Sequence, residues 1–159
     1  MSYLFRQSKE DEVLALTKMS EAAFHSDKEF GGGEGGPTGY DHYDFHMNHC
    51  REGRLFSLLD ENKLVAGAIL KKQDEELYIY RIFVDPKEFH KGYGLALMNA
   101  IEETFPTVNR YCLDTPEWNI RTNHFYHKCG YIVTGKEHTP DLDLVLYEKV
   151  RENHFGNDA

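Results

Sequence analysis

Hydrophobic positions recur every three or four residues in some stretches of the chain and form alternating or continuous apolar runs in others. The first pattern is typical of helices that bury one face, and the second of strands. We expect helices over 13–23, 41–50, 95–105 and 119–129, and strands over 3–6, 54–59, 63–72, 77–84, 110–113, 131–136 and 142–148. Ser8 is the candidate N-cap of the first helix. This order predicts an α/β domain with a sheet of mixed direction rather than a regular βαβ repeat.

A run of glycines separates the first two predicted helices. Five of the six residues from Gly31 to Gly36 are glycine, and Pro37 follows. Because glycine loses the most backbone entropy when it is ordered, this segment predicts a mobile loop. It is too short to link two domains, so we expect one domain over residues 1–150 and a polar C-terminal tail over 151–159.

Composition narrows the class of protein. The chain has 159 residues, of which 40% are hydrophobic, and this is enough to build a core without disulfides or metals. Its net charge of −9 disfavours nucleic acid and anionic membranes as partners. The longest apolar run, 64–70, is far below the ~20 residues of a membrane span. Three widely spaced cysteines and the absence of a signal pattern predict a reduced, cytoplasmic protein.

Residues 82–97 combine a buried strand, a turn and a helix that opens on Gly92-Tyr93-Gly94. The first turn of a helix carries unpaired N–H groups and the positive end of the helix dipole, and glycine there lets a phosphate come close. Lys91 and His90 add cationic or donor groups. The segment therefore predicts a pyrophosphate cradle, while a tight turn that needs a positive φ is the plain structural alternative. It does not match a dinucleotide fingerprint, because Leu97 stands where the third glycine would be.

Two motifs in register resemble those of the GNAT superfamily of acyl-CoA-dependent N-acyltransferases. The first is a strand that ends in Val84-x-Pro86, followed by Gly92-Tyr93-Gly94 at the opening of a helix; Phe89 stands where the family usually has glutamine or arginine. The second is Asn119, then Tyr126, then Gly130-Tyr131, with Thr122 in place of the usual alanine. The resemblance covers residues 54–147 well, and the N-terminal third in element order.

The resemblance implies an α/β (α+β) fold with a central mixed, mostly antiparallel sheet of six to seven strands, flanked by about four helices. It implies acetyl-CoA as co-substrate, bound where the strand ending at Val84 splays from its neighbour, and no metal. The main chain of 82–84 would pair with the pantetheine arm, the loop over 89–95 would hold the pyrophosphate, and Asn119 would touch the pantetheine. The implied cofactor-binding residues are thus Ile82, Phe83, Val84, Phe89, His90, Lys91, Gly92, Tyr93, Gly94, Leu95 and Asn119.

The implied reaction is direct attack of a neutral amine on the thioester in a ternary complex. Tyr126 matches the family's general acid, because a phenol with a pKa of about 10 can give a proton to a leaving thiolate. A core tyrosine on a helix is the structural alternative. Glu76, upstream of Val84, is the candidate base, and its alternative is a solvated carboxylate at a strand end. Ordered water, His46 or His49 would also serve as the base.

The acyl acceptor carries no motif in this sequence. We expect the primary amine of a small molecule, and the acidic balance favours a cationic one. A non-catalytic acyl-CoA sensor or structural subunit with the same fold is the alternative function. His42, His46 and His49 share one predicted helical face, where a metal, a substrate contact or a plain polar face all fit the spacing. The glycine loop is either a lid over the acceptor or a flexible connection, and exposed sheet edges in such folds often pair into homodimers.

Overall fold

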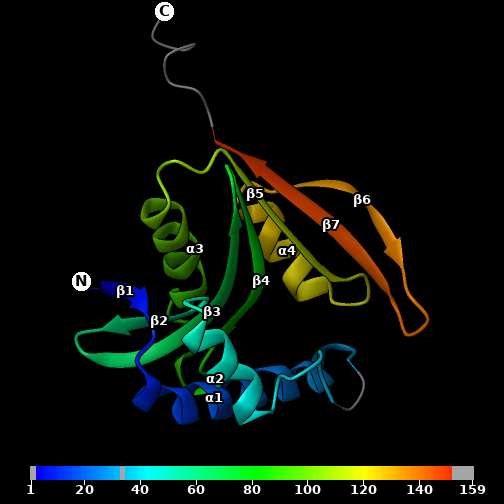
Figure 1. Ribbon diagram of the computed structural model, residues 1–159. Helices are drawn as coiled ribbons and strands as arrows, with labels where there is room; N and C mark the ends of the chain where they lie inside the picture. The colour runs from blue at the N-terminus through cyan, green and yellow to red at the C-terminus, as the bar shows by residue number, and fades with distance from the viewer. Residues whose placement is uncertain (1–2, 33–34, 152–159) are drawn as a thin grey trace, which may run out of the picture.

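The β-branched and aromatic runs of the sequence form seven strands of one sheet, in the order β1-β2-β3-β4-β5-β7-β6 (Figure 1). The computed structural model describes residues 3–32 and 35–151. The strands are β1 (Tyr3–Gln7), β2 (Leu55–Asp60), β3 (Lys63–Gln73), β4 (Glu76–Val84), β5 (Arg110–Pro116), β6 (Ile132–His138) and β7 (Asp143–Val150). The helices are α1 (Val13–His25), α2 (Tyr43–Arg51), α3 (Tyr93–Thr104) and α4 (Ile120–Lys128). Every helix and strand predicted from the sequence is confirmed.

Three details differ from the prediction. Helix α3 begins at Tyr93 rather than at 95, because Gly92 takes the N-cap position. Strand β5 extends to Pro116, because it pairs with β7 along its whole length. Ser8 as the cap of α1 is wrong: its hydroxyl lies 2.7 Å from Ser57 Oγ, and a 3-10 turn over Glu10–Glu12 precedes the helix.

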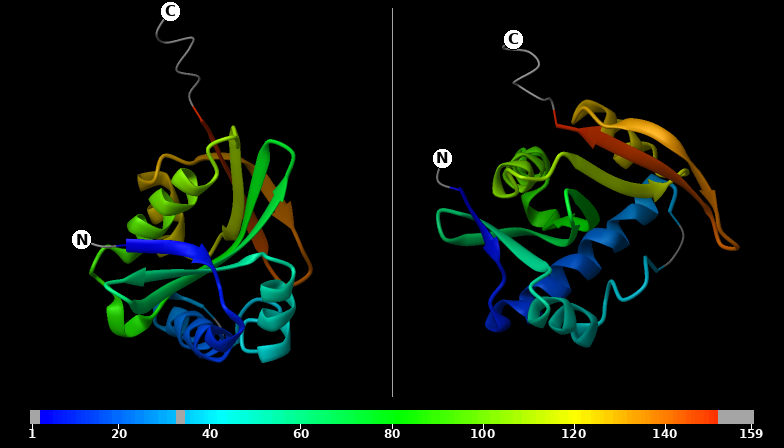
Figure 2. Two further views of the ribbon diagram at one scale, coloured as in Figure 1. Left: turned by 60° about the vertical axis from the view of Figure 1, so that its left-hand side comes forward. Right: turned by 45° about the horizontal axis from the view of Figure 1, so that its top comes forward.

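The sheet is mixed and mostly antiparallel, as the sequence predicts. Strands β4 and β5 run parallel, and every other neighbouring pair runs antiparallel. Helices α1 and α2 cover one face, and α3 and α4 cover the other (Figure 2). Each face buries its own core, with Leu16 and Ile69 on the α1 side and Leu97 and Ile101 on the α3 side. Full burial of such a side chain contributes roughly 1.5–3 kcal/mol, which holds the helices against the sheet.

Strand β4 contains one residue more than its partner requires. Ile69 pairs with Arg81 and Leu70 pairs with Ile79, so Tyr80 between them is a bulge. A bulge bends its strand and increases the local twist. Between the described parts of β4 and β5, the parallel ladder has three pairs and ends at Tyr78 with its partner Cys112. The two central strands diverge beyond this point, so the second half of β4 has no strand on its β5 side.

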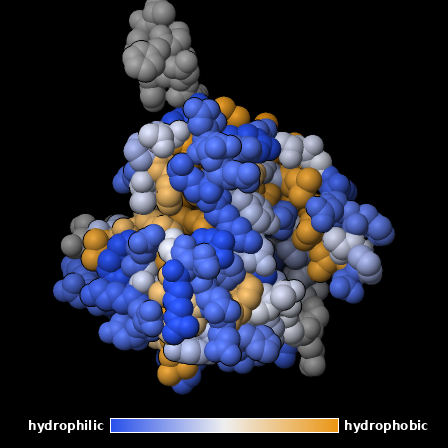
Figure 3. Space-filling view, in the orientation of Figure 1, coloured by the Kyte–Doolittle hydropathy of each residue, from blue (hydrophilic) through white to orange (hydrophobic). Residues whose placement is uncertain are grey.

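Some predictions concern the ends and the glycine loop. Gly33 and Glu34 of the predicted loop and residues 152–159 of the predicted tail lie outside the described residues. Arg151 donates to the carbonyls of Glu102 and Val108 at 2.7 and 2.9 Å. The division into one domain over 1–150 and a tail over 151–159 stays a prediction. Within the described residues, each helix is too short or too polar to cross a lipid bilayer. Figure 3 shows hydrophilic side chains over most of one face.

Candidate functional site

The turn between β4 and α3 leaves the first N–H groups of α3 without carbonyl partners inside the helix. Pro86–Glu88 form a 3-10 turn capped by Asp85, whose carboxylate accepts from the Lys87 N–H at 3.0 Å. His90 and Gly92 then take positive φ angles of 68° and 82°. Gly92 is the N-cap of α3 and supplies no side-chain cap. The positive end of the α3 dipole is therefore available to an anion.

The two glycines of Gly92-Tyr93-Gly94 are required for different reasons. Gly92 adopts the positive φ, and a Cβ added there would meet nothing within 4 Å. A Cβ on Gly94 would lie 3.3 Å from the Phe125 ring, so Gly94 permits the close packing of α3 on α4. The turn interpretation is thus confirmed for Gly92, and the open space before it also leaves room for a phosphate. Tyr93 donates to Asp60 Oδ2 at 2.6 Å, and Leu95 is exposed.

Charged side chains around this turn form ion pairs with one another. Glu88 is buried, and its carboxylate accepts from Lys63 Nζ at 2.8 Å and from Lys91 Nζ at 2.9 Å. These two lysines lower the pKa of Glu88 below its usual value. Lys91, predicted to add charge for a phosphate, is therefore already ion-paired. The guanidinium carbon of Arg121 lies 5.6 Å from the Phe89 ring centre, so α4 brings to the turn a cation that sequence reasoning missed.

The unpaired edge of β4 presents main-chain groups of two predicted residues. The Asp85 N–H donates to the Val65 carbonyl at 3.0 Å, and bonded pairs alternate along an antiparallel ladder. Ile82 and Val84 therefore direct their N–H and C=O groups away from β3, toward the side that β5 has left. Phe83 falls at a position bonded to β3, and its side chain packs in the core beside α1. Of residues 82–84, two can pair with an extended ligand.

Tyr126 lies buried on α4, with the ring centres of Tyr131 and Tyr147 at 6.2 and 5.7 Å. Among the residues that the structure describes, its hydroxyl has no hydrogen-bond partner, whereas buried tyrosine hydroxyls normally find one. Burial raises the pKa of this phenol, and Cys129 and Asp114 raise it further. Because a raised pKa keeps the hydroxyl protonated, Tyr126 is a donor that lacks an acceptor.

Asn119 has structural tasks at the start of α4. Its side-chain oxygen accepts from the Thr122 N–H at 3.1 Å, and its Nδ2 reaches Asp27 Oδ1 at 3.5 Å. Thr122, which replaces the usual alanine, lies 2.7 Å from Thr115 through the two hydroxyls. Arg121 donates to the same Asp27 oxygen at 2.6 Å. These bonds tie the start of α4 to the segment after α1, and the contact of Asn119 with a ligand stays a prediction.

The described part of the glycine loop packs against the same end of α4. A Cβ on Gly32 would lie 2.7 Å from the Trp118 ring and 2.9 Å from the Asp27 carbonyl oxygen. The Gly32 N–H donates to that carbonyl at 2.9 Å. Gly31 and Gly32, at the start of the predicted mobile loop, therefore lie in a turn packed against Trp118.

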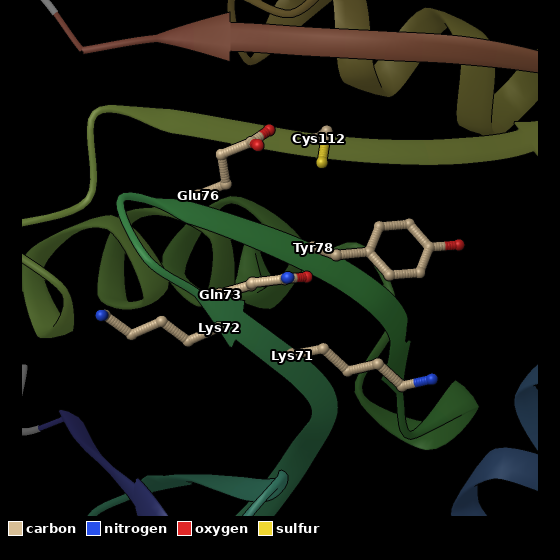
Figure 4. Close-up of a pocket in the computed structure, with 6 residues that line it drawn as sticks. All are labelled: Lys71, Lys72, Gln73, Glu76, Tyr78 and Cys112. Carbon is tan, nitrogen blue, oxygen red and sulfur yellow. The ribbon is translucent and has the colours of Figure 1, made fainter.

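Glu76, the predicted base, lies in the closed part of the β4–β5 ladder. It is the ladder partner of Arg110 and also forms an ion pair with the Arg110 guanidinium. Arg110 forms a second ion pair with Glu148. Figure 4 shows the Glu76 side chain turned toward β5. Glu76 thus stands beside the parallel pairs and not where the two strands diverge.

Asp114, a carboxylate that sequence reasoning missed, stands at the divergence itself. It follows Cys112 on the same face of β5, and its Oδ2 accepts from Tyr78 Oη at 2.7 Å, across the point where the strands separate. The pKa of Tyr126 is raised by burial first and by Asp114 among other groups. The pKa of Arg81 is lowered by burial, and Asp114 opposes that shift. Asp114 is therefore close enough to act on both the buried phenol and the guanidinium.

A pocket of about 250 Å³ opens beside Tyr78. Its lining side chains come from β3, β4 and β5, and they are Lys71, Lys72, Gln73, Glu76, Tyr78 and Cys112. Lys71 and Tyr78 are direct partners across β3 and β4, and Figure 4 shows both side chains extending in the same direction. The pocket therefore lies on the same face of the sheet as Tyr78. It extends from Tyr78 along the paired part of β4 and β5, away from the point where the two strands diverge.

The three histidines predicted to share a helix face have separate surroundings. His42 is exposed beside Asp41, and His46 is buried with Nδ1 2.8 Å from the His42 carbonyl oxygen. His49 Nδ1 accepts from Arg54 Nε at 3.2 Å. Burial lowers the pKa of His46, and burial together with nearby cations lowers the pKa of His49 to about 4. Within the described residues, no three His, Cys, Asp or Glu side chains come together as metal ligands.

Comparison with known proteins places this geometry in context. The model of the acetyltransferase (GNAT) family matches residues 20–131. No protein with a curated description matches the chain. Solved structures of three of the proteins with a similar fold are described next. Their sequence identity to this chain is low, so the similarity concerns the fold alone.

The first is PaiA N-acetyltransferase from Thermoplasma acidophilum in complex with coenzyme A, with 18% identity and a TM-score of 0.78 over 94% of this chain and 99% of that one. The second is a GNAT-family acetyltransferase from Streptococcus agalactiae, with 17% identity and a TM-score of 0.82 over 95% and 96% of the two chains. The third is a GNAT-family acetyltransferase from Bacillus anthracis, with 20% identity and a TM-score of 0.73 over 96% and 97%.

Proposed function

Since this chain belongs to the acetyltransferase (GNAT) family, we propose that it transfers an acetyl group from acetyl-CoA to the primary amine of a small acceptor. The observation that carries the proposal is the continuity between the unpaired edge of β4 and the unpaired N–H groups of α3. An extended arm that ends in a pyrophosphate matches this arrangement, because a strand edge binds the arm and a helix N-terminus binds the phosphates.

On the donor side, Ile82 and Val84 pair with the pantetheine arm through their main chain. The pyrophosphate lies against the amides that follow Gly92, where the missing Cβ leaves space. Arg121 brings a guanidinium near Phe89 but is paired with Asp27, as Lys91 is paired with Glu88. Backbone recognition of this kind does not depend on the side chain at position 89.

The chemical step needs two proton transfers. The neutral amine attacks the thioester carbon, a C–N bond forms, the C–S bond breaks, and the thiolate takes a proton from Tyr126. Asp114 accepts the proton that the amine loses, directly or through a water molecule. We favour Asp114 over Glu76 because Asp114 stands where β4 and β5 diverge, whereas Glu76 is ion-paired with Arg110.

The alternative function is a sensor that binds acyl-CoA without turnover. A site without a general base for the amine would support this alternative. Asp114 removes that argument, since it offers a carboxylate at the divergence.

Calorimetric titration with acetyl-CoA, followed by free-thiol release on the same sample across a panel of amines, tests the proposal. We expect micromolar binding and thiol release that depends on added amine. Binding without release by any amine would support the sensor instead. Failure to bind acetyl-CoA would leave the family assignment as a statement about fold only.

A further inference from the structure

Arg81 is a cation without an anion in the part of the chain that the structure describes. It follows the bulge at Tyr80, and its guanidinium carbon lies 4.5 Å from the Tyr80 ring centre and 5.3 Å from the Phe45 ring centre. Its Nη1 is shielded from water and has no hydrogen-bond partner, while its Nη2 donates to Tyr80 Oη at 3.2 Å. Burying a charge without an ion-pair partner is costly, so this arrangement calls for an anion that the described residues do not place against Arg81.

Lys71 adds a second positive charge to the same ring. Its Nζ lies 4.1 Å from the Tyr80 ring centre, and the described residues give it no ion pair. The contrast with Lys63 and Lys91 is informative, because both of those lysines are paired with Glu88. The chain has 27 acidic and 18 basic side chains, so acidic residues are numerous enough to pair with every lysine and arginine. Its absence from both Lys71 and Arg81 is therefore a feature of this surface.

The local charge around Tyr80 is positive although the whole chain is acidic. His49, whose ring centre lies 5.9 Å from that of Tyr80, has a pKa lowered to about 4 by burial and then by Arg54, Lys71 and Arg81. Asp114 is the carboxylate that acts on Arg81, but its Oδ2 is bonded to Tyr78. A negative group of a ligand is thus drawn to Lys71 and Arg81, and a positive group to Asp114.

We propose that the acceptor carries an acid group, a carboxylate or a phosphate, in addition to the amine that is acetylated. Arg81 and Lys71 bind the acid group, since a planar guanidinium matches either oxyanion, and the amine faces Asp114. Lys71 also lines the pocket of about 250 Å³ beside Tyr78. This inference rests on the proposed function and replaces the cationic acceptor that the net charge of −9 favours. The charges beside the site decide the substrate class, because screening weakens the distant ones.

Matched pairs of amines test the acid group. Thiol release from acetyl-CoA is measured with α-amino acids and with the amines that remain after their decarboxylation, and with ethanolamine phosphate against ethanolamine. We expect the acid-bearing member to have a kcat/KM about 10-fold or more above its partner, the effect of one charge-assisted hydrogen bond. The two series separate a carboxylate from a phosphate.

Variants tie the preference to the two cations. Lys71→Met is expected to raise KM for the acid-bearing amine about 10-fold and to leave the decarboxylated amine unchanged. Arg81→Lys keeps a charge but loses the planar fork, and it should also reduce the preference. Lys18→Met, which removes an equal charge from an exposed position of α1, is the matched control and should change nothing.

The outcomes separate this inference from the proposed function. Equal or better use of the decarboxylated amines would overturn the acid-bearing acceptor and leave the transferase intact. Thiol release by no amine of either kind would also overturn it. Calorimetry with acetyl-CoA on the same sample then shows whether the proposed function fails too.

Discussion

The donor side and the acceptor side that we propose use different parts of the polypeptide. The donor side consists of main-chain groups, those of Ile82 and Val84 along β4 and the amides after Gly92 at the start of α3. The acceptor side consists of side chains, above all Tyr78, Arg81 and Asp114. Main-chain groups are the same whatever residue carries them, so the donor side accepts a change such as Phe89. The acceptor side changes its chemistry with each substitution.

On this proposal, a substitution can change the acceptor while the donor stays the same. A backbone site needs only a few residues that shape the chain, such as Gly92 and Pro86. A side-chain site needs a set of residues that agree in charge, and these come from β3, β4 and β5. The predictions below, in order of decreasing effect on turnover, separate the two sides.

Tyr126→Phe affects the step at which donor and acceptor meet, and we expect the largest loss. Removing the proton donor should lower kcat about 100-fold, while the Kd of acetyl-CoA stays nearly unchanged, because the ring is retained. Steady-state thiol release and calorimetry measure the two quantities. Tyr131→Phe is the matched control, since Tyr131 also carries a buried hydroxyl without a partner in the described chain and should keep its turnover. Unchanged turnover in Tyr126→Phe would show that the thiolate leaves unaided.

Asp114→Asn breaks the acceptor side alone. We expect kcat/KM to fall by about 10–100-fold, because the amide cannot take a proton. Acetyl-CoA should bind as before. Glu76→Gln removes the carboxylate that the sequence suggested, and a smaller effect is expected there. A larger loss in Glu76→Gln than in Asp114→Asn would return the role of base to Glu76.

Gly92→Val breaks the donor side alone. Valine at a φ of 82° is strained, and its side chain occupies the space before the first amides of α3. We expect the Kd of acetyl-CoA to rise about 10-fold, with no change in the order of preference among amines. Gly130→Ala introduces similar strain at a φ of 92° away from the site. If Gly130→Ala weakened acetyl-CoA binding equally, the effect would come from stability and not from the cradle.

Glu12→Gln touches neither side and should leave turnover unchanged. Arg6, the Lys9 N–H and Ser57 bond the Glu12 carboxylate and lower its pKa to about 2. A lowered pKa stabilises the fold above the unfolded value of about 4.3 and the stabilisation is lost as the pH falls toward 2. The variant should therefore lose roughly 1–3 kcal/mol of unfolding free energy at pH 7 and little near pH 2. Urea unfolding at the two pH values measures it, and an equal loss at both would argue against ionisation as the cause.

The fold could be predicted because helical and strand periodicities persist over whole elements. The turn before α3 could be predicted because glycine and proline mark special backbone geometry at Gly92 and Pro86. The bulge at Tyr80 carries no such mark, since tyrosine continues the strand pattern on both sides of it. Without the bulge, neither the divergence of the strands nor the direction of Arg81 follows from the sequence.

The acceptor side escaped prediction because its contacts join distant parts of the chain. Asp114 on β5 meets Tyr78 on β4, and Arg81 on β4 lies against the ring of Phe45 on α2. One sign was present: Arg81 is the charged residue inside an otherwise apolar and aromatic run from Leu77 to Val84. A buried charge in such a run often marks a functional site, and the role that we propose for Arg81 depends on neighbours that only the structure shows.

The bulge at Tyr80 means that the number of residues in β4, as well as their identity, decides which side chains face each side of the sheet. Before it, the odd positions Leu77 and Ile79 face α3 and α4; after it, the even positions Ile82 and Val84 do. The one extra residue in β4 therefore changes which alternate positions face α3 and α4. Because of this change, the Arg81 side chain lies on the opposite face, where we propose that the acceptor binds. Deletion of one residue at the bulge would turn every later side chain of β4 to the opposite face of the sheet. Evolution can therefore exchange residues here far more readily than it can add or delete one.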